Sequence, residues 1–157
     1  MKKILTLCIL HKDGQVLFGL KKRGFGEGKW NGFGGKVDKG ETIEEATIRE
    51  MKEEAGITVS NLKQHGILEF RFIQEPNEVL EVHIFGTNTY SGTPSESEEM
   101  KPQWYPIEKV PYESMWPDDT YWLPELLKGK CFRGGFMFGK DGEIIENTFS
   151  LVRCLEL

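Results

Sequence analysis

Short apolar runs and alternating apolar and polar positions recur along most of this 157-residue chain. Such patterns are typical of strands, and they predict strands at residues 3–10, 15–21, 65–74, 79–89 and 102–107. Turn residues join the middle pair at Glu75-Pro76-Asn77 and indicate a further hairpin around Asp141-Gly142 in the tail. Helical spacing occurs only after Thr42 and at residues 121–128, where Pro124 must lie within or near the first turn.

One domain is expected from the length and from the absence of any repeat or linker. Many strands and two helices predict an α+β fold for residues 1–157, with a mixed central sheet and helices packed on it. Lys2-Lys3 and the following apolar run weakly resemble a signal peptide. Because the run ends at Leu10 without a cleavage site, a strand is the better interpretation. No stretch is long enough to span a membrane, so we expect a soluble chain without a membrane partner.

Charge and cysteine usage narrow the partners and the compartment. The net charge of −5 argues against a nucleic-acid polymer, because phosphate backbones require basic surface. A small phosphorylated ligand remains compatible if metal ions neutralise the charge between ligand and protein. The three cysteines, Cys8, Cys131 and Cys154, are odd in number and show no CxxC spacing. We therefore expect a reduced, cytoplasmic chain with no disulfide and no zinc site.

The first predicted helix has clear ends. Thr42 and Glu45 have the spacing of a capping box, and Gly56 suits the position just past the last helical residue. The preceding segment, residues 24–35, holds six glycines. It is predicted to be an irregular loop that exposes its backbone to a ligand.

Two or three acids of this helix face the body of the protein. At 100° per residue, Glu50 and Glu54 share an arc with apolar Ile43 and Met51, and Glu53 lies beside that arc. Unpaired charge is costly to bury, and hard divalent cations with oxygen ligands would resolve the conflict. A polyphosphate needs such ions too, since two like charges 4 Å apart repel by roughly 4 kcal/mol at an effective dielectric near 20.

Residues 35–57 resemble the signature of the Nudix hydrolases, GX5EX7REUXEEXGU with U aliphatic or similar, at every specified position. The matching residues are Gly35, Glu41, Arg49, Glu50, Met51, Glu53, Glu54, Gly56 and Ile57. The resemblance implies an α/β/α sandwich and metal-dependent hydrolysis of a nucleoside diphosphate linked to another group. It also implies Mg²⁺ as the cofactor, with Mn²⁺ as a substitute.

The resemblance assigns roles within the acidic region. It implies that Glu50, Glu53 and Glu54 are metal ligands and catalytic residues, helped by the backbone carbonyl of Gly34. Glu99 resembles a further ligand supplied from outside the signature, although acidic runs of this kind are more often solvated loop. Glu50, Glu54 or Glu99 could activate the water, and the choice among them stays open.

Arg49 and Glu41 each have two interpretations. Arg49, which we include among the catalytic residues, can orient a neighbouring carboxylate by ion pairing. It could instead form a surface salt bridge of little energetic value. Glu41 is either a member of the acidic site or a charge that favours the helix N-terminus.

Segments outside the signature, residues 21–36, 81–85, 98–104 and 115–122, resemble the branch of the family that acts on oxidised purine nucleoside triphosphates. In that interpretation Trp116 stacks on the purine, a contact worth about 1–3 kcal/mol. Asp118, Asp119 and Asn31 offer hydrogen bonds to the purine edge. Two neighbouring carboxyls in an apolar pocket should not both ionise, so one would hold a proton near neutral pH. Alternatively, an aspartate caps the following helix and Asn31 is only a turn residue.

Five further residues are weaker candidates for substrate binding. Phe25, Phe70, Phe72 and Leu7 line the base pocket or are ordinary core, and Lys21 contacts phosphate or ends a strand in solvent. We expect a monomer that hydrolyses 8-oxo-dGTP and 2-oxo-dATP to the monophosphate and pyrophosphate. The alternatives are a Nudix hydrolase of ADP-ribose or a dinucleoside polyphosphate, and a non-catalytic nucleotide-binding module.

Overall fold

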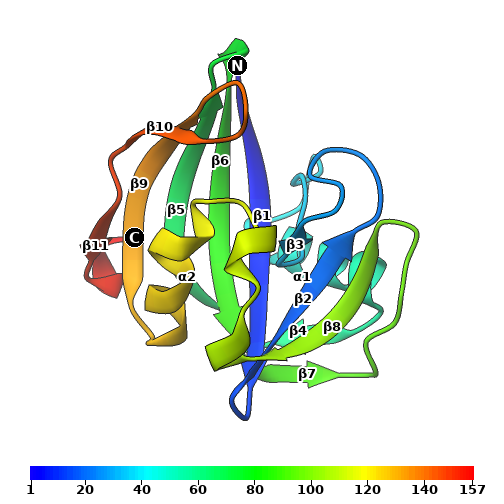
Figure 1. Cartoon of the computed structure of the whole chain (residues 1–157). Coiled ribbons are helices and arrows are strands. Elements are labelled where there is room, and N and C mark those ends of the chain that lie inside the picture. The colour runs from blue at the N-terminus through cyan, green and yellow to red at the C-terminus, as the bar shows by residue number, and fades with distance from the viewer.

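A mixed sheet of nine strands forms the centre of the computed structural model, which describes residues 1–157 (Figure 1). The strands are β1 (Lys2–Lys12), β2 (Gln15–Lys21), β3 (Trp30–Asn31), β4 (Thr58–Ser60), β5 (Lys63–Phe72), β6 (Glu75–Thr87), β7 (Thr89–Ser91), β8 (Met100–Pro106), β9 (Cys131–Phe138), β10 (Ile144–Asn147) and β11 (Ser150–Val152). The sheet order is β10-β9-β5-β6-β1-β2-β3, with β11 paired to β9 and β8 paired to β2. Strands β4 and β7 form a separate two-stranded sheet.

Two helices complete the fold, α1 (Ile43–Ala55) and α2 (Asp119–Leu127), with short 3-10 turns η1 (Ile107–Lys109), η2 (Tyr112–Ser114) and η3 (Cys154–Glu156). Alternate residues of β1 point to opposite faces of the sheet. Cys8 and Leu10 join the apolar cluster that contains Met51 of α1. Ile9 joins the cluster that contains Trp122 of α2. The helices therefore cover opposite faces, and the predicted α+β fold, an α/β/α sandwich with two main helices, is confirmed.

The ends of α1 follow the local sequence. The hydroxyl of Thr42 accepts a hydrogen bond from the Glu45 N–H at 3.0 Å, and the Glu45 carboxylate accepts one from the Thr42 N–H at 2.8 Å. Gly56 adopts a left-handed conformation with φ of 74°, and its N–H donates to the Lys52 carbonyl. A residue with a side chain would be strained there, so the glycine ends the helix.

The hairpin between β5 and β6 differs from the prediction. Its turn lies at Ile73 and Gln74, because β6 already begins at Glu75, opposite Phe72. The register then jumps to Arg71 opposite Val79, so that residues 76–78 have no partner on β5. The missing N–H of the proline within this unpaired stretch therefore costs no ladder hydrogen bond. The hairpin predicted in the tail is confirmed as β9 and β10.

The second helix begins earlier than predicted. It starts at Asp119 instead of residue 121, so Pro124 is its sixth residue and lies in the second turn. Trp122 and Leu123 bury themselves fully against the sheet, which holds the helix together despite the proline. No helix of the protein is both long and apolar enough to cross a membrane.

The expectation of no disulfide was wrong. Cys131 at the start of β9 is bonded to Cys154 in η3. The antiparallel pairing of β11 with β9 places Val152 opposite Cys131, and this register brings the two cysteine Cα atoms to 5.1 Å. Cysteine spacing could not reveal this pair, because the contact depends on long-range strand pairing. Cys8 is free and buried, and burial raises the pKa of its thiol to about 12.

Candidate active site

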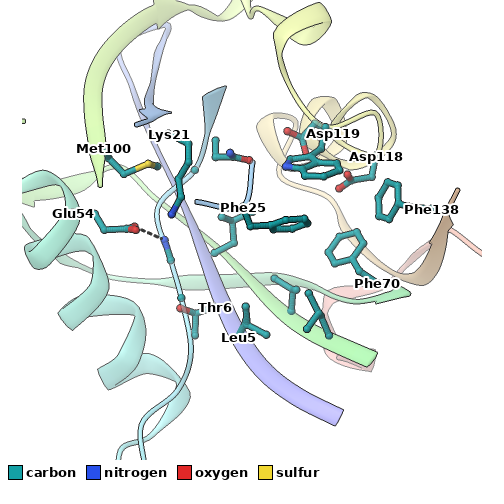
Figure 2. Close-up of a pocket in the computed structure, with 18 of the residues that line it drawn as sticks. Leu5, Thr6, Lys21, Phe25, Glu54, Phe70, Met100, Asp118, Asp119 and Phe138 are labelled. Carbon is teal, nitrogen blue, oxygen red and sulfur yellow. Dashed lines mark hydrogen bonds between the residues drawn. The ribbon is translucent and has the colours of Figure 1, made fainter. Parts of the chain in front are cut away.

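A mainly apolar cavity of about 230 Å³ lies between the acidic end of α1 and the start of α2 (Figure 2). Its floor comes from the strands β1 and β6, and its walls come from the glycine-rich segment, β5 and β9. Figure 2 shows Glu54 at one end of the cavity and Asp118 and Asp119 at the other. The lining residues are Leu5, Thr6, Leu7, Lys21, Phe25, Asn31, Gly32, Gly34, Gly35, Glu54, Phe70, Phe72, Leu80, Val82, Met100, Trp116, Asp118, Asp119 and Phe138.

Glu54 is a carboxylate held inside the protein. Only 8% of the residue is exposed, and its Oε1 accepts a hydrogen bond from the Gly34 N–H at 2.9 Å. Burial, opposed by the hydrogen bond from the Gly34 N–H and assisted by the nearby charge of Glu50, raises the pKa of Glu54 to about 7. Burial also raises the pKa of Glu50, although Arg49 opposes the shift. These two acids confirm the prediction that α1 turns carboxylates toward the protein body.

The backbone beside Glu54 leaves no room for a side chain at Gly34, and a side chain at Gly35 would displace the Glu50 carboxylate. A Cβ on Gly34 would lie 1.8 Å from the carbonyl oxygen of Thr6, and a Cβ on Gly35 would lie 2.8 Å from the Glu50 carboxyl carbon. The carbonyls of Phe33 and Gly35 accept hydrogen bonds from N–H groups of β1, whereas the Gly34 carbonyl accepts none from the protein. Its free lone pairs suit the metal-ligand role predicted for it.

Arg49 is the centre of a network that joins three glutamates. Its Nε and Nη2 donate to Glu41 at 3.0 and 2.7 Å, and its Nη1 donates to Glu50 at 2.9 Å and to Glu53 at 3.2 Å. The guanidinium hydrogen bond lowers the pKa of Glu41. Such a network differs from an isolated surface salt bridge, and it has the geometry needed to orient Glu50 and Glu53. Glu41 lies against Arg49 and so acts as the partner that fixes the guanidinium.

The side chains of the remaining predicted ligands, Glu53 and Glu99, are more exposed to solvent. The Glu53 side chain is 59% exposed and turns toward Arg49. Glu99 forms ion pairs with Lys21 at 3.2 Å and Arg23 at 2.9 Å, and these hydrogen bonds lower its pKa. The structure therefore does not gather three of these acids into one ready ligand cluster. Their oxygen donors, together with the Gly34 carbonyl, still form the donor set that a hard divalent cation prefers.

Asp118 and Asp119 form a second buried acid pair, with only 4% and 5% exposure. The indole N–H of Trp122 donates to Oδ2 of Asp118 at 2.8 Å. Asp118 occupies the N-cap position of α2, but its side chain makes no capping hydrogen bond, so capping does not explain the residue. Burial raises the pKa of Asp118 to about 6, and burial together with the charge of Asp118 raises the pKa of Asp119 well above its usual range. Near neutral pH, the favoured state is an ionised Asp118 beside a protonated Asp119.

Asn31 faces the cavity from a strand. It belongs to β3, opposite Gly19 of β2, and is therefore not a turn residue. A Cβ at Gly32, the next residue, would lie 2.7 Å from Cδ1 of Ile9. The close approach of this segment to β1 explains why a glycine follows Asn31.

Aromatic rings form the wall beside the acid pair. The Trp116 ring meets Phe138 edge to face at 5.6 Å between centroids and Phe25 in a tilted stack at 5.1 Å. Phe25 also meets Phe72 edge to face at 5.6 Å, and Phe70 packs on Phe138 at 5.8 Å. Phe25 is 67% exposed, so it is not a core residue. Phe70, Phe72 and Leu7 line the cavity while packing on the core beneath it.

Several lining residues escaped the sequence analysis, and Thr6 is the clearest. It is 2% exposed, and its hydroxyl has no hydrogen-bond partner within the protein. Thr6 is also the only hydroxyl residue in the apolar run of β1, a signal that could have found it. Met100, Leu80 and Phe138 were missed because apolar residues on strands usually belong to the core.

The chain is similar to known proteins in both sequence and fold. Residues 2–126 match the NUDIX domain. The chain is 50% identical over 153 residues to the oxidized purine nucleoside triphosphate hydrolase of Danio rerio, covering 98% of this chain and 97% of that protein. It is 48% identical over 143 residues to the protein of the same name from Mus musculus, covering 91% of each. The structure of a mutator MutT protein from Bacillus halodurans aligns with a TM-score of 0.85 at 28% identity, covering 94% of this chain and 97% of that one.

Proposed function

The chain belongs to the Nudix family, and from that premise we propose that it hydrolyses oxidised purine nucleoside triphosphates to the monophosphate and pyrophosphate. The observation that carries the proposal is the buried acid pair beside Trp116, in the same cavity as Glu54. One end of the cavity thus offers hydrogen bonds and a stacking surface for a base, and the other offers acids for the phosphate chemistry. The names of the two animal relatives support this choice of substrate.

Nudix hydrolases generally need divalent metal ions, and we propose Mg²⁺, with Mn²⁺ as a substitute. Such an ion would neutralise the polyphosphate and assist activation of the attacking water. The residues that would hold it are Glu50, Glu53, Glu54, Glu99 and the carbonyl of Gly34. Glu99 must first give up its ion pairs with Lys21 and Arg23.

The protein's own groups then divide the catalytic work. Glu50, Glu54 and Glu99 are the candidate bases that would accept a proton from water, and metal ligation competes with that role at each of them. Arg49 orients Glu50 and Glu53 through its network. Lys21 lines the cavity at the end that holds Glu54, and it is free to contact phosphate once Glu99 turns away.

Base recognition rests on the proton shared by the acid pair. A protonated Asp119 donates a hydrogen bond, and an ionised Asp118, which already accepts one from Trp122, accepts a second from the base. The Asn31 amide adds one acceptor and two donors. Moving the proton between the aspartates would let the pocket accept both 8-oxo-guanine and 2-oxo-adenine. A substrate preference that does not change with pH would count against this mechanism.

The test is a direct comparison of substrates. Hydrolysis of 8-oxo-dGTP, 2-oxo-dATP, dGTP and ADP-ribose is followed by mass spectrometry in the presence of Mg²⁺. We expect the two oxidised purine nucleotides to turn over fastest and to release pyrophosphate. Faster turnover of ADP-ribose would overturn the proposal, and tight binding without any turnover would identify a nucleotide-binding module instead.

We further propose that the protein acts as a monomer in the cytoplasm, where the nucleotide pool is found. In that reducing compartment, the Cys131–Cys154 bond would exchange with glutathione. Rapid alkylation of thiols in intact cells, followed by mass spectrometry, should then label Cys131 and Cys154 in part of the population. A bond that stays fully oxidised would place the protein in an oxidising compartment.

A further inference from the structure

Lys29 holds its charge over the aromatic ring that we assign to base stacking. Its ammonium nitrogen lies 5.2 Å from the centroid of the Trp116 ring. Lys29 is half-buried and is not among the residues that line the cavity, whereas Trp116 is. The ammonium therefore contacts the ring without itself lining the cavity. A cation so placed is attracted by the quadrupole of the indole.

The lack of any other partner sets Lys29 apart from neighbouring cations. Lys21, Lys22 and Arg23 all form ion pairs with acids of residues 96–99. The Lys29 ammonium makes no salt bridge and no hydrogen bond, although the chain carries more acids than bases. Apart from solvent, the Trp116 ring is therefore the group that attracts the Lys29 ammonium.

The backbone around Lys29 keeps it in place. The Lys29 carbonyl accepts a hydrogen bond from the Lys21 N–H at the end of β2, and the Lys29 N–H donates to the Gly26 carbonyl at 3.0 Å. Gly26 itself lies against the indole, since a Cβ there would come within 3.3 Å of the Trp116 Nε1. These contacts fix the backbone from which the Lys29 side chain reaches Trp116.

Trp116 in turn is tied to the acid pair. Its carbonyl accepts a hydrogen bond from the Asp119 N–H at 3.1 Å, so the indole and the acids belong to one turn of chain. A shift of the Trp116 ring would alter both the stacking surface and the distance between that surface and the carboxyl groups. The side chain that fixes the ring therefore affects recognition of the whole base.

We propose that Lys29 is a positioning residue for base recognition, which holds the Trp116 ring as the surface on which the purine stacks. This inference rests on the proposed function for the assignment of Trp116 to the base. Lys29 does not need to touch the nucleotide. It acts through the ring, and it should do so for any base, because stacking tolerates every base.

Three variants test this role. Lys29→Met keeps the length of the side chain and removes the charge, and Lys29→Arg keeps the cation over the ring. Lys12→Met is the matched control, since the Lys12 ammonium lies 5.7 Å from the centroid of Tyr90, which does not line the cavity. Calorimetry measures binding of 8-oxo-deoxyguanosine and of 8-oxo-dGMP, which are not hydrolysed. Lys29→Met should weaken both about two- to five-fold, the scale of one cation–π contact. Lys29→Arg should bind like the wild type, and so should Lys12→Met.

A second pair of variants separates positioning from direct contact. In a Trp116→Leu background, Lys29→Met should cause no further loss, because the ring through which it acts is gone. An equal loss in both backgrounds would overturn the inference, and so would a loss seen with 8-oxo-dGMP but not with the nucleoside. In turnover assays we expect Lys29→Met to raise KM while kcat stays near the wild-type value.

The same measurements distinguish failure of this inference from failure of the proposed function. If the wild type bound another purine nucleotide more tightly than the oxidised ones, the substrate assignment would fall. The Lys29 series would then be measured with that nucleotide. Unchanged affinity in Lys29→Met would reject the positioning role, whichever base the pocket prefers.

Discussion

Buried acids occur in two regions of this protein, and the two differ in what surrounds them. At the end of α1, Glu54 accepts a backbone N–H from Gly34, and Glu50 faces the guanidinium of Arg49. At the start of α2, Asp118 and Asp119 lie against each other, and only the indole N–H of Trp122 reaches the pair from a neighbouring side chain. The first region is arranged around positive charge, and the second is arranged around a shared proton.

The difference shows that a buried carboxyl group takes its role from its partners. At the end of α1, Glu50 and Glu53 have Arg49 as a cationic partner, and Glu54, whose pKa is raised to about 7, would lose its proton on binding a metal ion. At the start of α2 the two neighbouring acids have no cationic partner, so one of them keeps a proton and the pair becomes a donor beside an acceptor. One cavity can therefore combine phosphate chemistry with base recognition, although both ends are made of acids. If this comparison is correct, the two regions should respond separately to substitution.

The largest effect is expected from Glu54→Gln. The amide keeps the shape of the side chain but can neither hold a cation well nor accept a proton, so kcat should fall roughly 10²- to 10⁴-fold. Binding of 8-oxo-dGMP, measured by calorimetry, should stay close to the wild-type value. Glu44→Gln on the exposed side of α1 is the matched control and should keep full activity. Loss of base binding in Glu54→Gln would show that the two regions are not independent.

A smaller effect, of the opposite kind, is expected from Asp118→Asn. Asparagine can still accept the Trp122 hydrogen bond but removes the charge that the base would meet. The KM for 8-oxo-dGTP should rise about 10- to 100-fold, as for loss of a hydrogen bond to a charged group, and kcat at saturation should change little. Asp13→Asn, in the β1–β2 turn, makes the same chemical change at an exposed site. A fall in kcat with an unchanged KM would contradict the division between the two ends.

Glu41→Gln should have a moderate effect confined to the α1 region. Glu41 fixes the guanidinium that orients Glu50 and Glu53, so its loss should raise the Mg²⁺ concentration needed for half-maximal activity about ten-fold. Titration of activity with Mg²⁺ measures the shift, and the Glu44→Gln control applies again. Unchanged Mg²⁺ dependence would indicate that Glu41 serves only the N-terminus of the helix.

The smallest effect is a dependence of stability on pH. Because the pKa of Asp118 is raised to about 6, the folded protein binds more protons than the unfolded chain, where an aspartate titrates near 3.9. This contribution to stability is fully present below about pH 4 and is lost as pH rises through 6. Between pH 5 and 7.5, the free energy of unfolding in urea should fall by about 1 kcal/mol more in the wild type than in Asp118→Asn. Equal slopes in the two proteins would show that Asp118 does not keep a raised pKa.

Local chemistry made much of the fold predictable from sequence. The first hairpin and the capped helix α1 depend on residues that are close in the chain, and both were predicted correctly. The turn at Ile73-Gln74 was missed because a break in the β5–β6 register leaves the proline segment unpaired. The Cys131–Cys154 bond was missed because it depends on the pairing of β11 with β9. What stayed hidden in each case was register, which neighbours in sequence do not determine.

The residues of the candidate site that could be predicted were those whose type is unusual for a buried position. Acids on the inner arc of a helix and two aspartates beside a tryptophan conflict with ordinary burial rules, so they drew attention in the sequence. The structure brings these groups to one cavity. Met100 and Phe138 conform to those rules, and only their position in the fold shows that they line the same space.

The central place of β1 has a consequence for how the protein folds. This strand is synthesised first, yet it pairs in parallel with β6, from Lys2 opposite Val79 to Leu10 opposite Thr87. The edge of β1 that pairs with β6 must therefore stay unpaired until half of the chain has left the ribosome. Such long-range parallel pairing is slow. A nascent chain that stopped before Glu75 would carry an open, aggregation-prone strand edge. The floor of the cavity, which β1 and β6 form together, can therefore assemble only after β6 has been synthesised.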